Sequence, residues 1–188
     1  VEMVWYDEKG DAAEAVNAYN RLVGDVVALI GDVTSKPSIA VAELAAQDNM
    51  PMITATSTAY DVTTPGPNIF RACFLDPYQG EMMGTYAAND MGVKTAAIIY
   101  NNSDDYSTGL AESFKAKFEE LGGTVVAYEA YASSDIDYKA QLTNIADKNP
   151  EVVFMPDYYN RVAMIVKQAR EAGLDVPFLG ADGWDGLL

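Results

Sequence analysis

Short apolar segments alternate with longer amphipathic segments along almost the whole chain. The apolar segments lack two-residue alternation, which is typical of parallel strands covered on both faces. The amphipathic segments have apolar residues at helical spacing, as at Leu110, Phe114, Phe118 and Leu121, and this spacing predicts helices. Strands that alternate with helices favour βαβ units and therefore an α/β fold with parallel sheets.

Two predicted helix starts carry capping signals. Asp11 is followed three residues later by Glu14, and Asp76 is followed by Pro77 and Gln79. Both patterns are typical of an N-cap with a capping box, in which the third residue reaches back to the cap. The expected strands are Met3–Tyr6, Val26–Ile30, Met52–Thr54, Ile69–Ala72, Ala96–Tyr100, Thr124–Ala127, Val152–Met155 and Val176–Leu179.

The composition is that of a folded globular protein, with 49% apolar and 21% charged residues among 188. No apolar run approaches the roughly 20 residues needed to span a bilayer, and no signal peptide is visible. The chain opens within a strand-like run, so we expect a mature protein without its ends. A net charge of −16 argues against nucleic acid or an anionic membrane as the partner.

Several classes of chemistry are excluded or unsupported. The chain has no histidine, which rules out Ser-His-Asp and Cys-His nucleophiles and the common histidine-containing zinc sites. Cys73 is the single cysteine and allows no internal disulfide. The sequence has no glycine-rich phosphate loop. Residues 180–186 are rich in glycine and follow a strand, but their glycine spacing does not match such a loop. Asp104 and Asp105 are expected as cap or turn residues. We therefore expect no catalysis, no metal and no cofactor.

Hydroxyl residues follow two consecutive predicted strands. Ser35 comes after the strand that ends at Ile30, at the start of a helix, and residues 54–58 supply three threonines and a serine. Free N–H groups at a helix start bind anions, and ligands of open α/β sheets lie beyond the carboxyl ends of the strands. This pattern predicts a site for a small carboxylate. Ordinary turn and capping roles are the alternative.

Three further residues follow strands of the second half of the chain. Tyr106, Tyr158 and Asp182 come shortly after the strands that end near residues 100, 155 and 179. A tyrosine combines an apolar face with a polar tip, which suits the covering of a ligand. A carboxylate at a strand end suits an ammonium group. Partly buried rim tyrosines and a turn aspartate are the alternative reading.

Together these segments resemble the type I periplasmic solute-binding proteins, in particular the leucine/isoleucine/valine-binding branch that serves ABC importers. The resemblance extends over essentially the whole chain. Its motifs are Tyr6-Asp7, Ile30-Gly31 with Ser35, residues 51–54 with Thr58, Phe70-Arg71, Asp76 with Gln79-Gly80, Tyr106 with residues 109–111, and residues 168–170 with 172–174.

The resemblance implies two doubly wound parallel-sheet lobes that close on a ligand by a hinge motion. Residues 1–75 would be part of an N-terminal lobe, which is incomplete, and residues 76–188 most of a C-terminal lobe. The family's first strand, which precedes Val1, and its C-terminal portion are absent, so the chain looks like an internal fragment. We therefore expect residues 1–75 to be the less stable part.

The resemblance also implies roles for the site residues. Ser35 and Thr58 would bind the ligand carboxylate, and the Thr56 carbonyl would accept from the ammonium group. Asp182 would supply the opposing negative charge, at a position where the family often has glutamate. Tyr106 and Tyr158 would cover the ligand from the second lobe.

The implied function is binding of a small L-amino acid, aliphatic or branched-chain, outside the cytoplasmic membrane. The partner would be the membrane permease of an ABC importer, and the protein would be periplasmic or extracellular, with or without a lipid anchor. Two other binding functions stay open: an amine-free carboxylic acid as ligand, and the ligand-binding domain of a sensor or receptor. An enzyme on a similar fold is disfavoured, since no acid–base pair supports catalysis.

Overall fold

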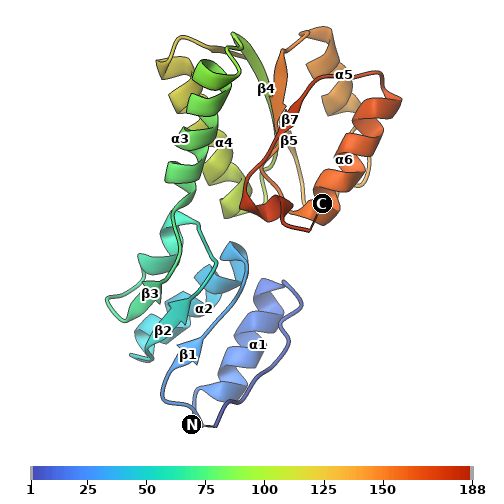
Figure 1. Cartoon of the computed structure of the whole chain (residues 1–188). Coiled ribbons are helices and arrows are strands. Elements are labelled where there is room, and N and C mark those ends of the chain that lie inside the picture. The colour runs from blue at the N-terminus through green and yellow to red at the C-terminus, as the bar shows by residue number, and fades with distance from the viewer. Residues whose placement is uncertain (1, 187–188) are drawn as a thin grey trace. The chain divides into compact units, whose positions relative to one another are not determined.

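Seven parallel strands form two separate sheets in the part of the chain that the structure, a computed structural model, describes, residues 2–186 (Figure 1). Each sheet belongs to its own unit, and the division falls between Leu75 and Asp76. We call residues 2–75 the first unit and residues 76–186 the second unit. All strand pairs in both units are parallel, as the alternation of strands and helices predicts.

The sheet of the first unit has the order β1-β2-β3 and carries its helices on one face. Residues Leu29, Met52 and Ile69 form one row across the sheet and pack into a core with the helices. The next row, Ile30, Ile53 and Phe70, is 75%, 40% and 54% exposed. The elements are α1 (Ala12–Leu22), β1 (Leu29–Ile30), α2 (Ser35–Gln47), β2 (Met52–Thr54), the 3₁₀ turn η1 (Tyr60–Thr63) and β3 (Ile69–Arg71).

The prediction of a strand at Met3–Tyr6 is wrong. The segment is extended along α1 but pairs with no strand, and β1 pairs only with β2 among the described residues. An apolar run becomes a strand only when a neighbour accepts its backbone hydrogen bonds, and that requirement cannot be read from the run itself. The side chains of Met3 and Trp5 are accordingly 76% and 78% exposed.

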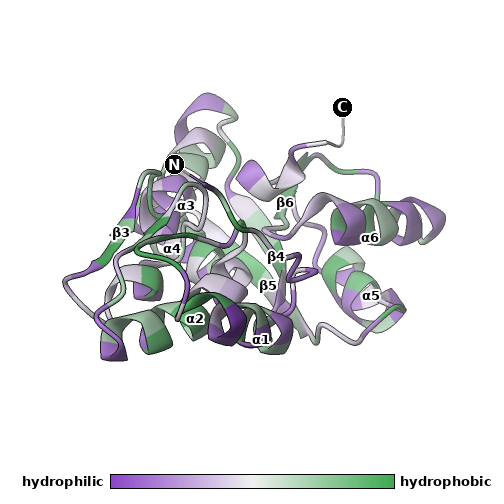
Figure 2. Ribbon diagram, turned by 90° about the horizontal axis from the view of Figure 1, so that it is seen from below, coloured by the Kyte–Doolittle hydropathy of each residue, from purple (hydrophilic) through white to green (hydrophobic). Residues whose placement is uncertain are grey.

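The second unit has the sheet order β5-β4-β6-β7, with α3 and α4 on one side and α5 and α6 on the other (Figure 1). Figure 2 shows both hydrophobic and hydrophilic positions along α6, as expected for a helix that covers a sheet. The elements are α3 (Asp76–Thr85), the π-helical turn η2 (Tyr86–Asp90), β4 (Thr95–Asn101), α4 (Asp105–Glu120), β5 (Thr124–Tyr131), α5 (Lys139–Asp147), β6 (Val152–Phe154), α6 (Tyr159–Glu171), β7 (Phe178–Leu179) and the 3₁₀ turn η3 (Asp182–Trp184).

Strand β4 fills two cores with alternate side chains. Ala97 and Ile99 pack with α5 and α6, whereas Ala96 and Ile98 pack with Phe114 and other residues of α4. All four strand residues are completely buried. The second unit is therefore doubly wound, and β4 is held in place from both sides.

The starts of α1 and α4 follow the signals in the sequence, whereas Asp76, expected as a cap, is the first residue within α3. Asp11 caps α1 by accepting from the N–H groups of Ala13 and Glu14, and Asp104 caps α4 by accepting from Tyr106 N–H. The expected box at Asp11 is half formed, since its own N–H donates to the carbonyl of Glu8. Asp104 confirms the expectation of a cap residue.

Helices α3 and α4 approach each other closely at Gly80. A Cβ atom placed there would lie 2.6 Å from Ser113 Cβ and 2.9 Å from the Leu110 carbonyl oxygen. The backbone of a packed helix cannot retreat from such a contact without loss of packing elsewhere. Gly80 therefore sets the distance between the two helices.

We expect Gly80→Ala to destabilise the protein by about 1–3 kcal/mol, because overpacking against backbone outweighs the better helix propensity of alanine. Denaturant unfolding measures the effect. Gly24→Ala is the matched control, since its Cβ would meet nothing within 4 Å. Equal unfolding midpoints for the two variants would contradict the close packing of α3 on α4.

Candidate ligand site

The carboxyl ends of β1 and β2 bring the hydroxyl residues of the first unit together. β1 ends at Ile30 and the chain enters α2 at Ser35, while β2 ends at Thr54 and continues through residues 55–58. The hydroxyl of Ser35 accepts from the N–H of Ala59 at 3.2 Å. Sequence analysis expected these two segments to meet at one edge, and the structure brings them together.

The backbone carbonyl of Asp32 organises this edge. Its oxygen accepts from the hydroxyls of Thr54 at 2.9 Å, Ser57 at 3.1 Å and Ser38 at 3.3 Å. The hydroxyl of Thr56 donates to the neighbouring carbonyl of Val33 at 2.7 Å. Hydroxyl groups thus link the loop after β1 to the segment after β2, a structural role of the kind that sequence analysis kept as the alternative to ligand binding.

The expected carboxylate-binding residues of the first unit differ in their surroundings. Ser35 and Thr58 are 1% and 2% exposed, whereas Thr56 is exposed. Among the described residues, none forms a hydrogen bond with the Thr58 hydroxyl. Thr34, the N-cap residue of α2, makes no side-chain cap bond.

The Asp32 carboxyl group occupies a different place from its carbonyl. Burial, and next the charge of Glu8, raise its pKa to about 6. Its Oδ2 atom is buried without a hydrogen bond to the described residues. Asp32 is also among the residues that line a cavity of about 510 Å³, together with Trp5, Tyr19 and other largely apolar residues of the first unit.

The second unit brings Tyr106, Tyr158 and Asp182 together at the carboxyl edge of its sheet. Tyr106 lies in the first turn of α4, Tyr158 is the N-cap residue of α6, and Asp182 begins η3. The rings of Tyr106 and Tyr158 are stacked, with their centroids 4.9 Å apart. Tyr106 is 2% exposed, Tyr158 is half-buried and Asp182 is exposed.

Asp182 is linked to two other elements of the second unit. The Tyr106 hydroxyl donates to its Oδ1 atom at 2.7 Å, and the Gln79 side-chain amide donates to the same atom at 2.9 Å. The prediction that Gln79 completes a capping box is therefore wrong, because its amide faces Asp182 rather than the start of α3. Burial and the Asp182 charge raise the pKa of Tyr106, which keeps its proton.

Two glycines of residues 180–186 allow the loop to pack closely. A Cβ at Gly180 would lie 2.0 Å from the ring of Trp184, and a Cβ at Gly183 would lie 2.8 Å from the Tyr106 hydroxyl. The indole N–H of Trp184 donates to the Met155 carbonyl at 3.0 Å. The glycine spacing that does not fit a phosphate loop is thus explained by packing around Asp182.

Sequence analysis missed a buried acid behind this edge. Asp157 is 2% exposed, accepts from the Tyr131 hydroxyl, and accepts from Tyr158 N–H at 2.7 Å. Burial raises its pKa. The pKa of half-buried Asp104 is raised to about 6, first by burial and then by the charge of Asp157. No local pattern marks Asp157, since its partner Tyr131 lies on β5, 26 positions earlier in the sequence.

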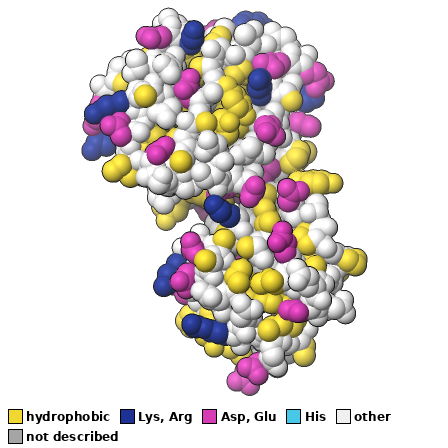
Figure 3. Space-filling view, turned by 180° about the vertical axis from the view of Figure 1, so that it is seen from behind, with side chains coloured by type: hydrophobic (Ala, Val, Ile, Leu, Met, Phe, Trp, Pro, Cys, Tyr) yellow, Lys and Arg dark blue, Asp and Glu magenta, His cyan; other side chains and the backbone are white. Residues whose placement is uncertain are grey.

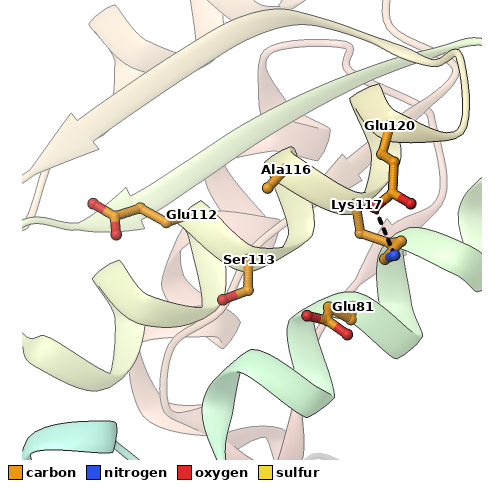
Figure 4. A pocket seen from close by; sticks show the side chains of 6 residues that line it. All are labelled: Glu81, Glu112, Ser113, Ala116, Lys117 and Glu120. Carbon is orange, nitrogen blue, oxygen red and sulfur yellow. Dashed lines mark hydrogen bonds and ion pairs between the residues drawn. The ribbon is translucent and has the colours of Figure 1, made fainter.

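A further pocket of about 300 Å³ lies between α3 and α4 (Figure 4). It is lined by Glu81, Glu112 and Glu120, and Lys117 pairs with Glu120 at 2.6 Å. No group of acidic, histidine or cysteine side chains within residues 2–186 could hold a metal ion. Figure 3 shows acidic side chains spread over the visible face rather than gathered at one place, as expected for a solvated acidic surface.

Comparison with known proteins gives a family match over the whole chain. The model of the family described as "periplasmic binding protein" matches residues 1–188. A curated relative, Leu/Ile/Val-binding protein homolog 3 of Brucella melitensis, is 31% identical over 185 residues. The match covers 97% of this chain and 50% of the relative. The chain spans about half the length of the curated relatives it matches.

Solved structures show the same similarity. The leucine-binding protein LivK of Thermotoga maritima matches with a TM-score of 0.93 and 37% identity, over 98% of this chain and 53% of that one. LivJ of Streptococcus pneumoniae, solved in complex with isoleucine, matches with a TM-score of 0.88 and 32% identity, over 97% and 52%. As for membrane segments, no helix within residues 2–186 is both long and apolar enough to cross a bilayer.

The Asp104 carboxyl group generates a prediction about pH. Folding raises the pKa of this acid, so the unfolded state loses its proton first as the pH rises. The cost in stability therefore grows as the pH rises from about 4, the ordinary value for an aspartate, to about 6, and stays constant at higher pH. Asp104→Asn keeps an acceptor for Tyr106 N–H and removes the charge. At pH 8 the variant should be more stable than the wild type by on the order of 1 kcal/mol, and this advantage should shrink by pH 5.

Denaturant unfolding at pH 5, 6.5 and 8 measures this difference. Asp105→Asn is the control, because Asp105 is the exposed neighbour in the first turn of α4. Its small effect should have the opposite sign, since a negative charge near a helix start is stabilising. A stability difference for Asp104→Asn that stays constant over this pH range would refute the raised pKa.

Proposed function

The chain belongs to the periplasmic binding protein family, and from this premise we propose that it binds a small L-amino acid as part of a solute-binding protein of an ABC importer. The proposed ligand is aliphatic, with a branched side chain. The proposed partner is the membrane permease of the importer, so the protein acts outside the cytoplasmic membrane, with or without a lipid anchor. Binding and delivery of the ligand involve no bond breaking, and we propose no enzymatic activity.

The observation that carries the proposal is the environment of Asp182. Its carboxylate stands exposed at the carboxyl edge of a parallel sheet, where ligands of such sheets bind. Two donors reach Oδ1, and Oδ2 has no hydrogen bond to the described residues. A carboxylate with one oxygen available is a suitable partner for the ammonium group of an amino acid.

Residues of the first unit are proposed to bind the other end of the ligand. Ser35 and Thr58 offer hydroxyls to the carboxylate, and the first turn of α2 adds backbone N–H groups. The carbonyl of Thr56 is proposed to accept from the ammonium group. As the family resemblance implies, one ligand molecule is bound by residues of both units, and closure supplies the second set of contacts.

The two tyrosines are proposed to cover the ligand as a stacked pair. Tyr158 is half-buried and supplies the accessible ring, while Tyr106 lies behind it. A half-buried ring beside a carboxylate gives the aliphatic part of an amino acid an apolar surface. Tyr158 is therefore proposed to meet the side chain of the ligand.

A thermal-shift screen of the full-length protein against the amino acids tests the function, since a ligand stabilises the native state by mass action. With the best ligand, Asp182→Ala should raise Kd roughly 30- to 150-fold, about 2–3 kcal/mol, because the ammonium group loses its charged partner. Calorimetry measures Kd.

The control for this prediction is Asp185→Ala. Asp185 is another exposed aspartate of the same loop, and its loss should leave Kd within about twofold of the wild type. Unchanged affinity in Asp182→Ala would remove Asp182 from the site. Tight binding of the deaminated acid by the wild type would identify an amine-free carboxylic acid as the ligand.

A second prediction separates the two ends of the ligand. Thr58→Val removes one hydroxyl at nearly constant shape, so it should weaken every amino-acid ligand by a similar factor, about 3- to 10-fold. Tyr158→Ala should instead change the ranking of leucine, isoleucine, valine and alanine. Calorimetry with this panel measures both effects. A changed ranking in Thr58→Val with unchanged overall affinity would show that the roles are misassigned.

A further inference from the structure

Gln79 forms a double hydrogen bond with Asp182. Its Nε2 atom donates to Asp182 Oδ1 at 2.9 Å, and its Oε1 atom accepts from the Asp182 backbone N–H at 2.9 Å. The two residues are 103 positions apart in the sequence. The amide therefore fixes both the backbone and the carboxylate of a single exposed residue, at the end of a loop that follows β7.

Tyr106 fixes the same carboxylate from a second direction. Its hydroxyl donates to Asp182 Oδ1 at 2.7 Å and accepts from the Gly183 backbone N–H at 2.8 Å. Tyr106 is 2% exposed and belongs to the core that packs on β4, so its ring cannot move away. A Cβ at residue 183 would also lie 2.9 Å from the Asp157 carbonyl oxygen, and only glycine allows this close approach.

The Gln79 amide and the Tyr106 hydroxyl donate to the same oxygen of the Asp182 carboxylate, Oδ1. With Oδ1 held by two hydrogen bonds, rotation of the carboxylate is restricted and Oδ2 has a defined direction. A group held in its binding orientation loses less conformational freedom when the ligand arrives. An exposed aspartate at a loop end would otherwise sample several rotamers.

We propose that Gln79 and Tyr106 are positioning residues, which hold the Asp182 carboxylate so that Oδ2 faces the ammonium group of the ligand. The inference rests on the proposed function and extends it to Gln79, which need not touch the ligand, and to a second role for Tyr106. Gln79 is the more informative of the two, since its side chain is half-buried on α3 and its two hydrogen bonds reach only Asp182.

A double-mutant cycle in the full-length protein tests the inference, with L-leucine as the probe and Kd measured by calorimetry. The variants are Gln79→Leu, Asp182→Asn and the two combined. Gln79→Leu should raise Kd about tenfold, and Asp182→Asn should raise it more. Because Gln79 acts through Asp182, the double variant should bind no more weakly than Asp182→Asn alone. Tyr106→Phe should resemble Gln79→Leu.

Gln168→Leu is the matched control. The Gln168 amide makes the same kind of double link, accepting from Tyr138 N–H at 2.9 Å and donating to the Ile136 carbonyl at 2.9 Å. Its loss should affect unfolding about as much as the loss of Gln79, with Kd for leucine unchanged within twofold. A merely structural role of Gln79 predicts that the two variants have the same Kd.

The outcomes separate this inference from the proposed function. If the wild type binds no amino acid, the proposed function fails and the inference with it. If the wild type binds leucine and Asp182→Asn weakens binding, but Gln79→Leu does not, only the positioning role is overturned. Losses in Gln79→Leu and Asp182→Asn that multiply in the double variant would also overturn it, because they would show independent contributions.

Discussion

The arrangement of the second unit depends on the burial of β4 from both faces. Ala96 and Ile98 are committed to one core and Ala97 and Ile99 to the other, so a shift by one residue would exchange every side chain between cores. The register with β5 and β6 is thereby fixed. The chain leaves each parallel strand at the same edge, which determines where Tyr106, Tyr158 and Asp182 can lie.

Rigid packing behind the edge then decides which polar atoms remain available. Tyr106 is part of the core. Its buried ring is held by the surrounding side chains, and this fixes the direction in which its hydroxyl donates to Asp182. The buried Asp157 carboxyl group accepts a hydrogen bond from the Tyr158 backbone N–H. The exposed carboxylate of Asp182 is thus oriented by groups that are themselves immobilised, which is the arrangement that precise binding needs.

The fold and most helix ends could be predicted from the sequence because their signals are local. Asp11 and Asp104 cap helices through N–H groups two or three residues away, and β2, β4 and β6 are recognisable as apolar runs. Pairing and side-chain partners are not local. Met3–Tyr6 has the composition of a strand but pairs with no strand among the described residues. Gln79 bonds a residue 103 positions away instead of its own helix start. The proximity of Tyr106 and Asp182 could be anticipated because both follow strand ends of one parallel sheet. The contacts of Gln79 and Asp157 could not be anticipated in this way.

The two units carry different polar groups at the carboxyl ends of their strands, and the difference depends on how two aspartates are oriented. In the first unit the Asp32 carbonyl accepts from the hydroxyls of Thr54 and Ser57, while its Oδ2 atom is buried without a hydrogen bond to the described residues. An ionised carboxylate among those hydroxyls would repel an anionic group. In the second unit Asp182 is directed outward by Gln79 and Tyr106. The edge of the first unit thus carries neutral hydroxyl groups, whereas the edge of the second unit carries a carboxylate, so the two edges differ in the charge they favour in a bound group. The zwitterion that we propose as the ligand has no net charge, so the net charge of −16 exerts little net long-range force on it, and we expect short-range contacts to govern its binding.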